Sequence, residues 1–257
     1  MMSSRDPDAS TPEAAGAHTP ASDAPVQARR FYSAVSIERT PSGYEIRLDG
    51  RTVKTPKQAV LIAPNVDLAA SIAREWDAQT DRIVPSTMPV TKLVNSAIDV
   101  VTPNCEAVRA DIVAYALNDA LCYRADGPAE LVARQLAVWD PIIAWAECAL
   151  GARFTVTTGI VHIDQPDATR AALEAATVAI APLPLTAVHV VTTLTGSGLL
   201  ALALLARQIT AEAAWIAAHV DEDHQIGLWG EDAEATERRH RRWRDMEAAG
   251  RLLESLR

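Results

Sequence analysis

The sequence predicts an α+β fold, with a small antiparallel β-rich domain followed by a larger multi-helical domain. In residues 29–64 apolar and polar side chains alternate, and turn residues separate the runs, as in antiparallel strands. After Pro64 apolar residues recur at helical spacing instead. We therefore expect a β-rich N-terminal domain at residues 29–64, with an alternative boundary near residue 90, and a mainly helical domain at residues 65–257.

The bulk composition is that of a globular protein, with 49% hydrophobic and 22% charged residues. A net charge of −9 argues against nucleic acid as the main partner, because a phosphate backbone requires a basic surface. Cys105, Cys122 and Cys148 are widely spaced and form no C-x-x-C pair. This spacing predicts a reducing compartment, without a disulfide framework or a zinc site.

The first ordered segment is predicted to be a small β-meander. Residues 1–28 are rich in Pro, Ser, Thr and Ala and hold almost nothing large and apolar, so we expect a disordered tail. The tail is acidic and does not look like an Arg-rich transit peptide. From Phe31 onward strands are expected, and Asp49-Gly50 is a strong hairpin signal. The residues that alternate inward are Val35, Ile37, Tyr44, Ile46 and Leu48.

Helices are expected in most of the remaining chain. Asn65 is a candidate N-cap for a helix that ends near Gln79, and Pro128 marks the start of a long helix that Gly151 ends. A short strand is predicted at residues 154–157. Further helices are predicted at residues 90–101, from Asn104 with Tyr115 facing inward, from Asp164 or Asp167 to Ile180, from Thr210, and from Gly230 to the end of the chain.

The apolar run at residues 183–206 approaches the roughly 20 residues that a membrane-spanning helix needs. It contains His189 and, at residues 192–198, a cluster of Thr, Ser and Gly. We therefore predict one buried helix, in which the small residues let another helix approach closely.

Residues 219–237 are rich in Asp and Glu and contain no Lys or Arg, whereas arginines crowd residues 238–244. One interpretation is dipole matching, with acids at a helix start and bases further along. Another is a surface that presents acids and an aromatic ring to a macromolecule. Trp229, framed by Gly227 and Gly230, is correspondingly either a core residue or an interface residue.

No catalytic motif is present: the sequence lacks G-x-S-x-G, a P-loop and G-x-G-x-x-G. His219 and Asp223 have helical i, i+4 spacing, but a metal site needs a third ligand and none is evident, so no metal is expected. Two alternative functions remain open. One is a hydrolase or transferase with an interdomain carboxylate site at Asp221, Glu222 and Asp223. The other is an acidic adaptor that binds basic partners.

Several short segments, taken in order, resemble one family. They are Phe31–Tyr32, Leu48–Pro56, Glu75–Gln79, Met88–Asp99, Asp119–Tyr123, Trp139–Pro141, Leu194–Ser197, Asp223–Ile226 and Trp229–Gly230. In this order they are similar to the ATP synthase assembly factor twelve family, chaperones of the alpha subunit of the synthase's catalytic head. The resemblance covers about residues 30 to 255, and it implies a β-rich N-terminal domain joined to a helical C-terminal domain.

The resemblance also implies a function. It predicts a non-enzyme without metal, nucleotide or other cofactor, which binds the free ATP synthase alpha subunit and prevents its aggregation until the beta subunit replaces it. We expect a bacterial cytoplasmic protein, monomeric when free, with no nucleic acid partner and no membrane insertion. The expected partner-binding residues are Glu222, Asp223, Gln225, Trp229, Gly230 and Glu231, and the expected structural or supporting residues are Glu75, Trp76 and Asp77.

Overall fold

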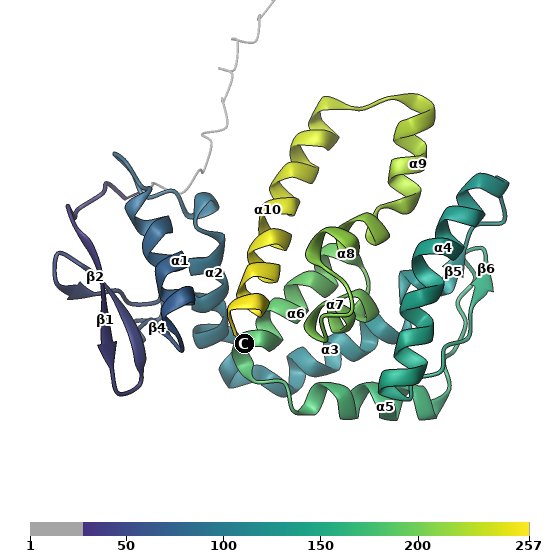
Figure 1. The fold of residues 1–257 in the computed structure, drawn as a ribbon, viewed down its shortest axis with the longest axis horizontal. Helices are drawn as coiled ribbons and strands as arrows, with labels where there is room; N and C mark the ends of the chain where they lie inside the picture. Colours follow the sequence, from purple (N-terminus) through teal and green to yellow (C-terminus); the bar gives the residue numbers. More distant parts are fainter. Residues whose placement is uncertain (1–27, 257) are drawn as a thin grey trace, which may run out of the picture.

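A computed structural model describes residues 28–256 of the chain. The small antiparallel sheet lies at one end, with the helices α1 and α2 beside it, and the remaining helices form the larger part of the molecule (Figure 1). This arrangement confirms the predicted α+β fold. The predicted disordered tail lies outside the described residues, apart from residue 28.

The sheet has four strands in which β1 pairs with β2, and β2 pairs in turn with β3 and β4. Asp49 and Gly50 both have positive φ, at 48° and 79°, as the type I′ turn requires, and this confirms the predicted hairpin. Gly43 has a φ of 136°, and a Cβ there would lie 2.5 Å from the Ala63 carbonyl oxygen. The strands are β1 (Val35–Thr40), β2 (Gly43–Leu48), β3 (Arg51–Thr52) and β4 (Ile62–Ala63).

The expected alternation holds in β2 but fails in β1. Ile46 and Leu48 of β2 are buried, whereas Ile37, which lies opposite Ile46, is 37% exposed. β1 is an edge strand that pairs only with β2, so its outer side is left to solvent. The prediction that Ile37 faces the core was therefore wrong.

Helix α1 (Val66–Asp77) packs against β1, β2 and β4, so the sheet and this helix share one core. It begins as predicted, because the Asn65 side-chain oxygen accepts a hydrogen bond from the Leu68 amide at 2.9 Å. The next segments are η1 (Pro85–Thr87), α2 (Pro89–Ser96), the π-helical η2 (Ala97–Val101) and η3 (Thr102–Asn104).

The rest of the described chain is mostly helical, with one two-stranded parallel sheet. The strand predicted at residues 154–157 is shifted to Thr157–Thr158, and Tyr115, expected to face inward, is exposed. The elements are α3 (Cys105–Leu117), η4 (Ala120–Cys122), β5 (Tyr123–Arg124), α4 (Ala129–Trp145), η5 (Ala146–Leu150), β6 (Thr157–Thr158), α5 (Asp167–Val178), α6 (Pro182–Thr195), α7 (Gly198–Leu205), α8 (Ala211–Ala218), α9 (Val220–Trp229) and α10 (Ala233–Ser255).

The apolar run forms two buried helices, α6 and α7, and the prediction of one helix was wrong. Gly196 ends α6 in the left-handed region, at a φ of 69°, and the Ser197 hydroxyl accepts from the Leu200 amide to begin α7. A Cβ on Gly198 would lie 2.7 Å from the Ala116 Cβ, so this glycine does allow close approach to α3. Within residues 28–256 no helix is both long and apolar enough to cross a membrane.

A fully buried carboxylate, Asp119, joins the start of α7 to the segment that follows α3. One carboxylate oxygen accepts from the Ser197 hydroxyl and the Leu199 amide, each at 2.9 Å, and the other accepts from the Leu121 amide at 3.1 Å. Burial raises the pKa of Asp119 from 3.8 to about 6, although the hydrogen bonds act in the opposite direction. Two of the segments that carry the family resemblance, Asp119–Tyr123 and Leu194–Ser197, therefore meet at this carboxylate.

We expect Asp119→Asn to destabilise the protein by about 2 kcal/mol at pH 7.5, because one acceptor becomes an NH2 group that faces donors. The pKa of Asp119 is higher in the folded state, so its contribution to stability is full below pH 4 and is lost as the pH rises through about 6. Asparagine does not titrate. Urea unfolding between pH 4.5 and 7.5 should therefore show that the variant is least stable, relative to the wild type, at the lowest pH. A difference in unfolding free energy that does not change with pH would contradict the raised pKa of Asp119.

Candidate functional site

Helices α9 and α10 form a hairpin at one end of the helical region (Figure 1). We call α9, residues 230–232 and the first two turns of α10 the α9–α10 hairpin. Gly230 ends α9 with a φ of 84°, and Asp232 begins α10 by accepting a hydrogen bond from the Ala235 amide at 2.8 Å. The last helix therefore begins at Ala233, three residues later than predicted at Gly230.

The acids at the start of α9 complement its dipole, as the first interpretation predicted, but the bases expected further along the same helix lie in α10 instead. Two of the acids also hold the hairpin in place. The Asp221 carboxylate accepts from the buried Gln135 side chain of α4 at 2.6 Å, and Asp223 forms an ion pair with Arg239 of α10, also at 2.6 Å. These contacts fix α9 between α4 and α10.

Glu222 has a different environment. Its carboxylate lies 3.8 Å from the Nε2 atom of His219, the residue between α8 and α9. The His219 ring is buried against Trp215, with ring centroids 3.9 Å apart, and its Nδ1 donates to the Trp215 carbonyl at 2.7 Å. Burial lowers the pKa of His219, so the imidazole is neutral near pH 7 and Glu222 has no ion-pair partner among the described residues.

Trp229 is 85% exposed at the end of α9, and the interpretation of this ring as a core residue was therefore wrong. Its neighbour Leu228 is 62% exposed, and Gln225, Gly230 and Glu231 are exposed as well. A large exposed aromatic ring among polar side chains is typical of protein interfaces.

A groove of about 260 Å³ lies between the two helices of the hairpin. Most of the expected partner-binding residues are at this groove, although Asp223 and Glu231 do not line it. The sequence did not predict that α10 lines the groove, because nothing in its Arg-rich pattern shows which residues face α9. The groove is lined by Glu222, Gln225, Ile226, Trp229 and Gly230 on one side, and by Asp232, Ala235, Thr236 and Arg239 on the other.

Glu75, Trp76 and Asp77 lie in α1, far along the chain from the hairpin, and their contacts are structural. The Glu75 carboxylate accepts from the amides of Val90 and Thr91, each at 2.7 Å, and so caps α2. Burial raises the pKa of this carboxyl, against the effect of these hydrogen bonds. The Tyr32 hydroxyl donates to the Trp76 carbonyl at 2.6 Å, and the rings meet edge to face.

Other family-like segments also meet in pairs. The Asp99 carboxylate accepts from the Thr55 hydroxyl at 2.6 Å, which ties the segment after β3 to η2. The buried guanidinium of Arg124, the residue directly after the segment Asp119–Tyr123, donates to Asp140 at 2.7 Å and lies over the Trp139 ring. Many of the residues that carry the family resemblance thus hold the fold together. The α9–α10 hairpin therefore remains the best candidate for binding.

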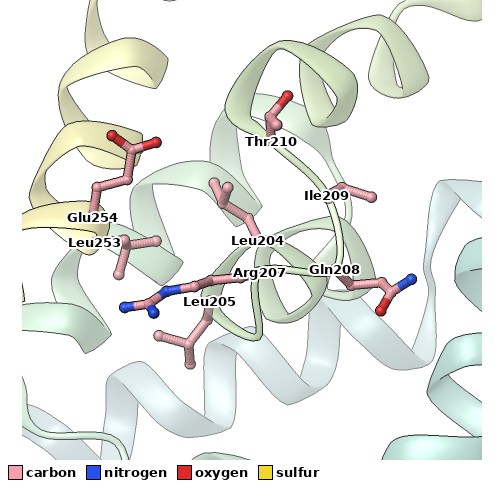
Figure 2. Close-up of a pocket in the computed structure, with 9 residues that line it drawn as sticks. Leu204, Leu205, Arg207, Gln208, Ile209, Thr210, Leu253 and Glu254 are labelled. Atoms are coloured by element: carbon pink, nitrogen blue, oxygen red, sulfur yellow. The ribbon is translucent and has the colours of Figure 1, made fainter. Parts of the chain in front are cut away.

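A second hollow, of about 240 Å³, lies between the α7–α8 connection and the end of α10. Figure 2 shows Leu204 and Leu253 at this hollow, with Arg207 extending toward the last turns of α10. Its only carboxylate among the described residues is Glu254, so it does not offer the converging carboxylates of the rival hydrolase or transferase. Across residues 28–256, no group of three or more His, Cys, Asp or Glu residues is arranged to hold a metal ion.

Comparisons with known proteins agree with the resemblance. The model of the ATP12 chaperone protein family matches residues 29–147. Atu1473 from Agrobacterium tumefaciens, a candidate chaperone, is 45% identical, with a TM-score of 0.84 over 89% of this chain and 86% of that one. Atp12 from Paracoccus denitrificans is 37% identical, with a TM-score of 0.83 over 90% of this chain and 99% of that one. This chain is thus a member of the ATP12 chaperone family.

Proposed function

We propose that this chaperone binds the free alpha subunit of the ATP synthase catalytic head and keeps it from aggregating until the beta subunit replaces it. The observation that supports this most is the exposed Trp229 ring beside the groove of the α9–α10 hairpin. An unassembled subunit exposes the apolar surface that its partner will later cover, and a holder must cover that surface reversibly. A rigid aromatic anchor with a polar surround provides this kind of contact.

The proposed contacts are those of the hairpin surface: Glu222, Gln225, Trp229, Gly230 and Glu231, with Asp223 as a support through its ion pair to Arg239. The proposed activity is stoichiometric holding, without catalysis and without a cofactor. The enzymatic alternative gains no support from the hairpin, because Asp221 and Asp223 are already bound to Gln135 and Arg239. A cytoplasmic location and a monomeric free state are part of the same proposal.

The first prediction concerns the aromatic anchor. Trp229→Ala should weaken binding of the alpha subunit by about 2 kcal/mol or more, because an aromatic anchor at the centre of an interface contributes that much. Light scattering of heated alpha subunit, with the chaperone at equal concentration, measures the protection. The matched control is Ile160→Ala, since Ile160 is 97% exposed in the loop between β6 and α5. Equal loss of protection in both variants would show that general surface apolarity, and not this anchor, is responsible.

The second prediction concerns charge. Tagged wild-type protein should recover the alpha subunit, without beta, from extracts of the source cell, and Glu222→Lys should reduce the recovery because it reverses an uncompensated charge at the groove. Asp164→Lys is the control, because it makes the same change at an exposed acid of the β6–α5 loop. Circular dichroism of each variant checks that it is folded. Recovery of no synthase subunit by the wild type would refute the proposed function.

A further inference from the structure

The groove of the α9–α10 hairpin carries uncompensated negative charge. Among the described residues that line it there is one cation, Arg239, and it is already paired with Asp223 at 2.6 Å. Glu222 faces a neutral His219, and Asp232 adds a second carboxylate at the far side of the groove. The other arginines of α10 do not line the groove. A ligand that enters it therefore meets carboxylates and, in the part of the chain that the structure describes, no free cation in the lining.

The groove also has an apolar lining. Ile226 of α9 and Ala235 of α10 line it together with the acids, and so does Trp229. A groove lined by apolar side chains, carboxylates and an aromatic ring matches a long aliphatic stem with a cationic head. Of the two basic side chains, arginine fits better, because its planar guanidinium stacks on an indole and can bind a carboxylate through two N–H groups.

We propose that the groove binds one arginine side chain of the client protein. The stem lies along Ile226 and Ala235, the guanidinium stacks on the Trp229 ring, and the Glu222 carboxylate accepts its N–H groups. This inference deepens the proposed function and rests on it for the identity of the client. The supporting argument is charge complementarity between an acidic groove, in which the Glu222 carboxylate has no cationic partner among the described residues, and a cationic residue of the client.

The first test uses the free alpha subunit and the full-length chaperone, with dissociation constants measured in 50 and 300 mM salt. Glu222→Gln should weaken binding by roughly fivefold in low salt and by less in high salt, because it removes a charged contact. Trp229→Leu should weaken binding by about tenfold, and the double variant by less than the product of the two effects, because both residues bind one guanidinium. Asp164→Asn should change nothing. Unchanged affinity of Glu222→Gln at both salt concentrations would overturn the proposal.

A second test does not depend on the client. N-acetyl-arginine amide should shift the indole N–H resonance of Trp229 saturably, whereas N-acetyl-citrulline amide, its neutral isostere, should not. Glu222→Gln should reduce the arginine shift. If the alpha subunit fails to bind but the arginine shift remains, the client identity is wrong and the groove chemistry stands. If arginine and citrulline act alike, the arginine site is refuted, whatever the alpha subunit does.

Discussion

The buried carboxylate of Asp119 is the contact on which the helical region depends most. It receives hydrogen bonds from the first turn of α7 and from the segment after α3, so it fixes the most deeply buried helix of the described chain. Helix α8 follows directly from α7, and α9 follows from α8. The position of the hairpin is thus set by a polar group that lies in the core, because a buried charge must satisfy its partners in one arrangement.

Local signals in the sequence predicted local structure well. The Asn65 cap, the Asp49-Gly50 turn and the long helix that ends at Gly151 all depend on neighbouring residues, and all were confirmed. The break at Gly196 was not predicted, because an apolar composition on both sides hides the change of direction. Ile37 was placed wrongly because alternation identifies a strand face, but not whether another element covers it.

The candidate site was predictable only in part. Composition identified the acidic stretch, yet its acids have separate tasks: Asp221 and Asp223 attach α9 to its neighbours, while Glu222 remains uncompensated. This division depends on Gln135, Arg239 and His219, which come from different helices or helix junctions. No spacing rule relates them, so only the three-dimensional structure distinguishes supporting acids from those available to a partner.

Helix α10 completes the groove at one end and, at the other, reaches the sheet side of the molecule, where the Asn65 side chain donates to the Ser255 carbonyl at 2.6 Å. One wall of the groove is therefore made by the last helix of the described chain. A chain in which residues 232–239 have not yet folded against α9 has no opposing wall. It therefore cannot hold a client in this groove until α10 has formed.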